Sequence, residues 1–238
     1  MVELGVPTEY DFALPRLRHE LFVRHALPLV PGLEALLDYG CGNGANTRLF
    51  SGNFRAVDGI DVEPERIDEA NARNTNANVS YTLYGGQAIP ASRQYDAVVS
   101  FEVLEHTESD AGSLRQIFER LKPGGVLMCT VPNKYYLMET HGFNFPFQDS
   151  IPYHRIPFLN LLPKWVYDRY GNARIYTRQQ ICGLVKDAGF HLAESGYLRA
   201  PLDKIRNPRV RSVVSRGIAA LPESMGVSVW LVATKPAG

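Results

Sequence analysis

The chain has 238 residues, of which 45% are hydrophobic and 21% charged, so it can form one large α/β domain or two small ones around a buried core. Lys and Arg together number 25, as do Asp and Glu, and the formal net charge is zero. No overall positive field therefore draws nucleic acid or an anionic membrane to the protein, which weakens the case for nucleic-acid binding without excluding a local basic patch. No window of about 18 uninterrupted apolar residues occurs, so no membrane-spanning helix is expected.

The cysteines and the N-terminal residues indicate the cellular compartment in which the protein is expected. Cys41, Cys129 and Cys182 are far apart in the sequence and odd in number, so neither a metal site nor a disulfide framework is predicted. The first residues contain no basic start followed by an apolar run, and no secretory signal is expected. These features predict free buried thiols in a cytoplasmic protein.

The first half of the chain alternates between strand and helix patterns. Apolar positions in residues 11–26 recur at helical spacing and predict an N-terminal helix that ends near Pro28. Strands are predicted at 35–38, 56–60, 79–84, 95–100 and 126–131, and helices at 45–50, 64–74 and 113–121. Strands that alternate with helices predict a parallel sheet covered on both faces, in a doubly wound α/β fold.

The pattern changes at Pro132, because residues 134–171 are rich in proline and aromatic residues. Regular structure resumes at Thr177, a good N-cap for a helix through Ala188, and two more strands are predicted at 190–198 and 227–233. We therefore expect a single domain, residues 1–238. Its predicted parts are an N-terminal helical cap (1–30), a cofactor-binding core (31–133), an insertion (134–173) and a C-terminal helix with a pair of strands (174–238).

A glycine-rich turn, Asp38-Tyr39-Gly40-Cys41-Gly42-Asn43-Gly44, follows the first predicted strand. Glycines permit positive φ angles and close approach of a ligand to the backbone, and the N–H groups of a following helix suit a carboxylate or a phosphate. A dinucleotide site has the pattern Gly-x-Gly-x-x-Gly, whereas here the third glycine comes one residue early. In addition, Asp38 would repel a pyrophosphate, although it would attract an ammonium or a sulfonium group.

Asp61 ends the second predicted strand and is placed to accept hydrogen bonds from ribose hydroxyls. A nucleoside that carries an amino acid and no phosphate fits the glycine spacing, Asp38 and Asp61 together. S-adenosylmethionine (SAM) is such a molecule.

Four segments resemble class I SAM-dependent methyltransferases (type 11/12-like), from about Leu33 to Asn133. They are Leu37-Asp38-Tyr39-Gly40-Cys41-Gly42-Asn43-Gly44, Gly59-Ile60-Asp61, Tyr95-Asp96-Ala97-Val98-Val99-Ser100-Phe101-Glu102-Val103-Leu104-Glu105-His106 and Leu121-Lys122-Pro123-Gly124-Gly125. The resemblance implies a seven-stranded Rossmann-like sheet whose last strand is antiparallel. It also implies that SAM lies near the glycine turn, with Asp61 on the ribose and Val62 beside the adenine.

The family often has an acid after the third strand that meets the adenine amino group. This chain has Gly85-Gly86-Gln87-Ala88 there, so Gln87 would supply a side-chain carbonyl instead. The candidate cofactor-binding residues are Asp38, Gly40, Cys41, Gly42, Asn43, Gly44, Asp61, Val62, Gly86, Gln87, Phe101 and Glu102.

Glu102, Glu105 and His106 follow the fourth predicted strand, at the sheet edge where ligands bind in open α/β folds. Their spacing places them on one face of a helix or turn, where two carboxylates and an imidazole can bind Mg²⁺. The segment is similar to the metal-binding segment of ubiquinone-biosynthesis O-methyltransferases. It is also similar to that of RNA 3′-end 2′-O-methyltransferases, which add a further histidine after the fifth strand, here His141 or His154. In the alternative, which we favour, there is no metal and the side chains make structural hydrogen bonds.

The insertion is interpreted as a lid over the methyl-transfer site, lined by aromatic residues, or as a loop packed on the core. A lid of this composition predicts a small apolar or aromatic acceptor, such as a quinone precursor or a lipid, and a peripheral contact with a membrane. Four arginines further on form either a patch for an anionic substrate or RNA, or a solvated helix face, which we favour. They are Arg206, Arg209, Arg211 and Arg216.

The predicted function is SAM-dependent O-methylation of a small apolar or aromatic acceptor. A hydroxyl acceptor must lose a proton, and His106, His141 and His154 are the candidate bases, although each also fits a structural role. The alternatives are a metal-dependent methyltransferase that acts on a glycan or an RNA 3′ end, an NAD(P)-dependent oxidoreductase, and a SAM-binding protein without catalysis. The expected partner is a small molecule, with DNA excluded and RNA disfavoured.

Overall fold

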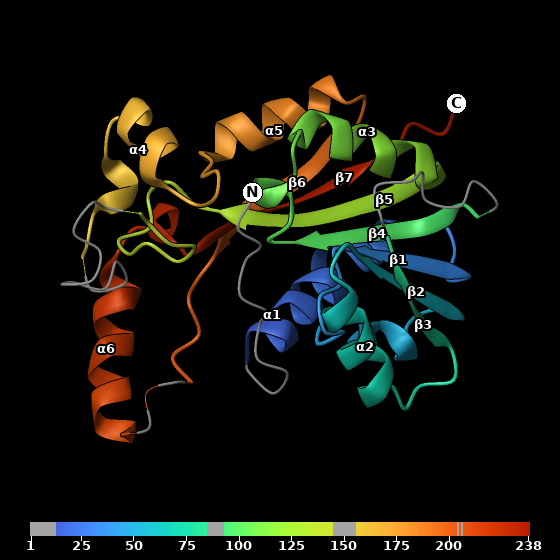
Figure 1. Ribbon diagram of the computed structural model, residues 1–238, viewed down its shortest axis with the longest axis horizontal. Helices are drawn as coiled ribbons and strands as arrows, with labels where there is room; N and C mark the ends of the chain where they lie inside the picture. The colour runs from blue at the N-terminus through green and yellow to red at the C-terminus, as the bar shows by residue number, and fades with distance from the viewer. Residues whose placement is uncertain (1–12, 85–92, 145–155, 204, 206) are drawn as a thin grey trace.

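The computed structural model describes residues 13–84, 93–144, 156–203, 205 and 207–238. They form one seven-stranded sheet with the strand order β3-β2-β1-β4-β5-β7-β6 (Figure 1). The strands are β1 (Ala35–Tyr39), β2 (Ala56–Asp61), β3 (Val79–Leu83), β4 (Tyr95–Phe101), β5 (Leu121–Pro132), β6 (His191–Leu198) and β7 (Ser228–Thr234). The first five are parallel, and β7 runs antiparallel to both β5 and β6. The predicted doubly wound fold with an antiparallel last strand is confirmed.

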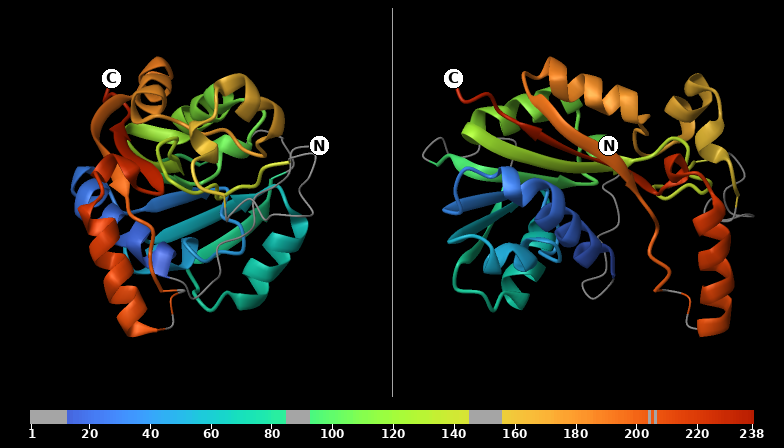
Figure 2. Two further views of the ribbon diagram at one scale, coloured as in Figure 1. Left: turned by 90° about the vertical axis from the view of Figure 1, so that its left-hand side faces the viewer. Right: turned by 180° about the vertical axis from the view of Figure 1, so that it is seen from behind.

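Helices cover both faces of the sheet (Figures 1 and 2). On one face, α3 (Asp110–Arg120) and α5 (Arg178–Asp187) pack on β4, β5 and β7 through a core that includes Leu114 and Ile181. On the other face lie α1 (Ala13–Leu21), a π-helical turn η1 (Phe22–Ala26), a 3₁₀ turn η2 (Leu27–Leu29) and α2 (Pro64–Arg73). Every residue of β1 and β4 is buried, as expected of central parallel strands.

Three of the differences from the predicted elements have a local explanation. The helix predicted at 45–50 is a 3₁₀ turn, η3 (Thr47–Gly52), because Gly52 and Asn53 end it after six residues. Helix α3 begins at Asp110 rather than at residue 113, because the Ser109 hydroxyl caps it by accepting a hydrogen bond from the Gly112 N–H at 3.0 Å. Strand β5 begins at Leu121 rather than at residue 126, since Leu121 already pairs with Tyr95.

The insertion folds around a small core of its own at the carboxyl end of β5. It contains the 3₁₀ turn η6 (Leu159–Leu161) and helix α4 (Lys164–Tyr170). Phe143, Leu159 and Tyr167 are buried against one another. Bridges between Asn133 and Tyr176 and between Phe143 and Gly171 tie the described parts of the insertion together. Packing within the segment thus accounts for several of its aromatic residues.

The remaining helical elements are α6 (Pro208–Ala220), η4 (Leu104–His106) and η7 (Glu223–Met225). Within the part of the chain that the structure describes, no helix is both long enough and apolar enough to cross a membrane.

Asp96 joins the first residues of β1, β4 and β5. Its carboxylate accepts hydrogen bonds from the backbone N–H groups of Glu34 and Ala35, at 3.0 and 2.9 Å, and from Lys122 Nζ at 2.7 Å. Burial by itself would raise the pKa of Asp96, but the Lys122 ammonium and the two N–H groups outweigh it and lower the pKa below 3.8. The carboxylate therefore stabilises the edge of the sheet opposite the ligand-binding edge.

We predict that Asp96→Asn lowers the free energy of unfolding by about 2 kcal/mol near pH 7, because three donors lose a charged acceptor. The pKa of Asp96 is lower in the folded protein than in the unfolded chain. Its contribution is therefore present above the unfolded pKa of about 3.9 and is lost as the pH falls through the folded pKa. Urea unfolding at about pH 7 and about pH 3 measures this difference.

The matched control is Asp187→Asn, which changes an exposed aspartate at the end of α5. An Asp96→Asn effect of equal size at both pH values would contradict the assigned role of the charge.

Candidate active site

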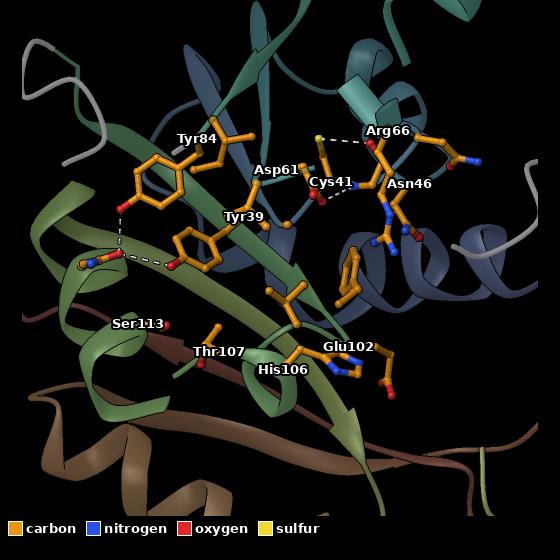
Figure 3. Close-up of a pocket in the computed structure, with 18 of the residues that line it drawn as sticks. Tyr39, Cys41, Asn46, Asp61, Arg66, Tyr84, Glu102, His106, Thr107 and Ser113 are labelled. Carbon is orange, nitrogen blue, oxygen red and sulfur yellow. Dashed lines mark hydrogen bonds between the residues drawn. The ribbon is translucent and has the colours of Figure 1, made fainter. Parts of the chain in front are cut away.

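A cavity of about 760 Å³ lies at the carboxyl edge of the sheet. It is formed by the residues that follow β1, β2 and β4, by the start of α3, by Arg18 of α1 and by Thr140 and His141 of the insertion. Figure 3 shows Tyr39 and Tyr84 on one side, Glu102 and His106 on the other, and Asp61 between them. Its size is that of a typical small-molecule site, and it lies where open α/β sheets bind ligands.

The glycine turn after β1 is held open toward this cavity. Gly40, Gly42 and Gly44 have φ angles of 80°, 54° and 80°, a region that L side chains rarely adopt. A Cβ atom on Gly40 would collide with the Val103 side chain, whereas one on Gly42 would have no neighbour within 4 Å. Gly42 therefore leaves its backbone accessible from the cavity.

Asp61 fixes this turn to the next strand. Its Oδ2 accepts a hydrogen bond from the Gly42 N–H at 2.8 Å, and its Oδ1 accepts one from the Glu63 N–H at 3.0 Å. The side chain is nearly buried but lines the cavity. The residue predicted to bind ribose therefore also sets the shape of the glycine turn.

Asp38 has a different position, because it does not line the cavity. Its Oδ2 accepts a hydrogen bond from the Thr47 hydroxyl at 2.6 Å, and the side chain is buried. Burial raises the pKa of Asp38 to about 7, although the Thr47 hydroxyl acts in the opposite sense. In this structure Asp38 anchors η3 behind the turn.

A buried cation stands beside the end of β4. Arg18 Nη2 lies 3.6 Å from Glu102 Oε1, and the guanidinium is 5.5 Å from the centre of the Phe101 ring. Glu102 has a φ angle of 56°, which turns its side chain away from the strand direction. Arg18 Nε has no hydrogen-bond acceptor among the residues described here. A positive and a negative group therefore line this part of the cavity together.

Glu105 is buried behind the cavity, in contact with two histidines. Its Oε1 lies 3.4 Å from His141 Nε2 and 4.0 Å from His106 Nε2, and Glu102 Oε2 lies 3.8 Å from the same His141 nitrogen. Burial and the charge of Glu102 raise the pKa of Glu105 above its ordinary value. Burial would lower the pKa of His141, but the carboxylates of Glu105 and Glu102 outweigh it and raise that pKa above 6.5.

Glu105, His106 and His141 each offer a ligand atom within 4.8 Å of the others. This group lacks Glu102 of the predicted metal set, which lies beside Arg18, and it includes His141, one of the two histidines expected as a further ligand. The described geometry thus brings a carboxylate and two imidazoles together at the cavity wall.

The loop that carries His141 is held by a buried carboxylate. Glu139 Oε1 accepts hydrogen bonds from the backbone N–H groups of Thr140 and His141, at 2.9 and 2.7 Å. Its Oε2 accepts one from the Tyr167 hydroxyl at 2.5 Å. Helix α4 is therefore connected to the His141 backbone through a single side chain.

The structure brings most of the predicted site residues together. Those that line the cavity are Gly40, Cys41, Gly42, Asn43, Asp61, Val62, Phe101, Glu102, His106 and His141. Asp38, Gly44 and Glu105 lie behind its wall. Gly86, Gln87 and His154 are outside the described residues.

Two parts of the site were missed by the sequence analysis. Arg18 shares a helix face with Leu14 and Phe22, so a charged residue within an apolar stripe was the available signal. The hydroxyls of Tyr39 and Tyr84 both donate to Gln116 Oε1 at 3.1 Å and form one wall of the cavity. Tyr39 lies within the glycine motif but at a position to which no role was given, and no motif marks Tyr84, after β3, or Gln116 of α3.

Comparisons with known proteins agree with this geometry. Residues 11–195 match the family model described as a methyltransferase domain. The chain is 29% identical over 177 residues to the ubiquinone biosynthesis O-methyltransferase of Burkholderia vietnamiensis, and the match covers 71% of this chain and 69% of that protein.

Two solved structures have the same fold. An S-adenosylmethionine-dependent methyltransferase from Mesorhizobium loti has a TM-score of 0.63 and 18% identity, over 95% of this chain and 100% of that one. The N-methyltransferase NodS from Bradyrhizobium japonicum, in complex with S-adenosyl-L-homocysteine, has a TM-score of 0.60 and 16% identity, over 95% and 89%. The family match therefore favours SAM over a dinucleotide. The chain belongs to the methyltransferase-domain family and is a class I SAM-dependent methyltransferase.

Proposed function

We propose that this enzyme transfers the methyl group of SAM to a hydroxyl group of a small apolar or aromatic acceptor. The observation that carries the proposal is the buried pair of His141 and Glu105, because a hydroxyl acceptor needs a group that takes its proton. The similarity to a ubiquinone biosynthesis O-methyltransferase supports an oxygen acceptor.

The cavity fits the three chemical parts of SAM. Asp61 accepts hydrogen bonds from the ribose hydroxyls, and Val62 lies beside the adenine. The adenine contacts predicted for Gly86 and Gln87 lie outside the described residues. The amino acid part lies against the glycine turn, where Gly42 leaves room for a ligand. Asp38 acts through Thr47 and the turn, since it does not line the cavity.

Arg18 and Glu102 complete this part of the site with opposite charges. We assign the Arg18 guanidinium to the carboxylate of the amino acid and Glu102 to its ammonium group. Bound SAM supplies an electrophilic methyl group, so the protein has to align the acceptor, exclude water and accept a proton.

His141 is the proposed base, with His106 beside it as a wall of the acceptor site. The two rings have their centres 5.3 Å apart, and both line the cavity. Glu105 orients the His141 ring and stabilises its protonated form, while Glu139 and Tyr167 hold the backbone beneath it. His154 remains a third candidate.

The insertion meets the cavity through polar side chains. Its described residues contribute only Thr140 and His141 to the cavity. We assign acceptor selection to the insertion, which covers the methyl-transfer site as a lid.

A divalent cation is a second candidate for activating the acceptor. Glu105, His106 and His141 place three ligand atoms within 4.8 Å of one another. Two imidazoles and one carboxylate suit Mn²⁺, Fe²⁺ or Zn²⁺ better than Mg²⁺, which prefers oxygen ligands. In that case the acceptors include hydroxyls of a glycan or of an RNA 3′ end.

Arg18→Ala tests the placement of the donor. We expect the Kd for SAM to rise about 10- to 100-fold, because a charge-assisted hydrogen bond is lost. Calorimetric titration should give an unchanged Kd for adenosine, which lacks the amino acid. Arg24→Ala, at an exposed arginine of the same N-terminal segment, serves as the control. Equal losses for SAM and adenosine would show that Arg18 acts through the fold instead.

The function itself is tested by turnover of SAM with a panel of phenols, lipids, glycans and RNA ends, beside the O-methylated form of each phenol. We expect S-adenosylhomocysteine to form with phenols and not with their methyl ethers. His141→Gln should lower kcat by a factor of about 10² to 10⁴, the usual contribution of a general base. Turnover of amines with no turnover of any hydroxyl would refute the proposal.

The pH profile tests the role of Glu105 in the same assay. Since His141 must be neutral to accept a proton, we expect the rate to rise with pH through the raised pKa of His141 and then to level off. Glu105→Gln removes a negative charge, lowers that pKa and moves the profile to lower pH. Treatment with a chelator should leave the rate unchanged. Loss of activity that Mn²⁺ or Mg²⁺ restores would favour the metal instead.

Tyr167→Phe tests the support of the His141 loop. The buried Glu139 loses a donor, so we expect the free energy of unfolding to fall by about 2 kcal/mol. If Glu139 positions His141, kcat should fall while the Kd for SAM stays constant. Tyr135→Phe, at an exposed tyrosine of the insertion, is the control. An unchanged kcat would show that Tyr167 stabilises the fold but does not help to position His141.

A further inference from the structure

The connection between β6 and β7 contains a helix that has almost no contact with the body of the protein. These strands are neighbours in the sheet, yet residues 199–227 separate them and include α6. No residue of α6 is buried, and in Figures 1 and 2 the helix stands away from the sheet. Arg199 Nη1 donates a hydrogen bond to the Ile218 carbonyl at 2.5 Å, close to its C-terminal end. An isolated helix of 13 residues is only marginally stable in water, so α6 would gain stability from a surface that covers its apolar face.

The exposed side of α6 carries an apolar stripe. Val210, Val213 and Gly217 follow one another at helical spacing, and Val213 is 68% exposed. Val214 and Ile218 lie on the same apolar face of the helix, and both are partly buried. The helix is therefore amphipathic, with part of its apolar face turned to solvent.

Arginines flank this stripe on both sides. Arg209 and Arg216 lie along one side and Arg211 along the other, as the helical spacing requires. Among the residues that the structure describes, none of the three guanidinium groups has a carboxylate partner. The positive charge of the helix is thus available to an anionic surface.

The charge of the chain is divided unevenly between this connection and the rest. Residues 199–221 contain six Lys and Arg and a single acid, Asp203, which leaves 19 Lys and Arg against 24 Asp and Glu elsewhere. The formal net charge of zero is therefore the sum of a basic segment, residues 199–221, and an acidic remainder of the chain. An anionic surface would attract the segment and repel the remainder, which orients the molecule.

A second exposed apolar group lies at the same end of the molecule. Helices α4 and α6 lie at this end in Figure 1 and in the right panel of Figure 2, and the left panel, which faces this end, shows them apart from each other on it. Trp165 of α4 is 74% exposed, and Phe158 and Leu161 of the insertion are also exposed. Tryptophan at such a position is typical of proteins that touch the interface of a lipid bilayer.

We propose that α6 binds the surface of an anionic lipid bilayer. Val210 and Val213 enter the interface, the arginines bind lipid phosphates, and Trp165 provides a second contact. A second copy of this chain is a poorer occupant, because its own arginines would repel those of the first. RNA would leave the valine stripe exposed, and α6 has no aromatic residue for base stacking. The proposal does not depend on the identity of the methyl acceptor.

Vesicle flotation tests this with the whole chain. We expect binding to phosphatidylcholine vesicles that contain phosphatidylglycerol, with an emission shift of exposed Trp165, and little binding to phosphatidylcholine alone. R209Q/R211Q/R216Q should weaken binding by about a hundredfold, because each cation near an anionic surface contributes about 1 kcal/mol. Val210→Ser/Val213→Ser should weaken it as well, although this variant keeps all three arginine charges of α6.

The matched control is R24Q/R55Q/R115Q, which removes the same charge from exposed arginines outside α6 and should bind as the unaltered protein does. Unchanged SAM binding shows that each variant is folded. Equal binding by the two triple variants would overturn the proposal, as would no binding to anionic vesicles. Dimerisation that depends on Val213, or RNA binding that depends on these arginines without vesicle binding, would also overturn it.

Discussion

At the end of β4, Glu105 is buried and Glu102 is partly buried at the cavity wall, and the partners of these two acids tie three parts of the chain together. Arg18 of the N-terminal helix faces Glu102, and His141 of the insertion contacts both acids. Burying such charges is costly unless partners lie close by. The helical cap and the insertion therefore do more than cover the sheet, because each supplies a side chain that faces these acids.

The same edge explains how a single cavity can hold a donor and a reactive centre. Asp61 and the glycine turn shape the donor side by backbone hydrogen bonds, which are insensitive to the acceptor. The histidines lie on the other side, carried by η4 and by a loop fixed through Glu139. In the proposed mechanism, donor binding is thus built into the sheet, whereas proton transfer to His141 depends on a segment added after β5. A change of acceptor would leave the first part intact.

Local sequence patterns were sufficient for the parallel α/β core and the glycine turn, and the family resemblance supplied the seven strands with an antiparallel last one. Most of the residues predicted around the donor line the cavity. Asp38 shows the limit of that reasoning: its position in the motif was clear, but its bond to Thr47 is tertiary. His141 was a candidate among three, and nothing local indicated that it would meet Glu105 across the insertion. Arg18 and Gln116 reach the cavity from distant helices, so only the fold reveals them.

The long connection between β6 and β7 leaves and re-enters the sheet at adjacent points, because Leu198 pairs with Ser228. Closing a loop costs free energy that grows only with the logarithm of its length, so the sheet is nearly indifferent to what the connection contains. The helix in it behaves as an independent module. It could be lengthened, recharged or exchanged during evolution while the catalytic edge stayed under separate selection.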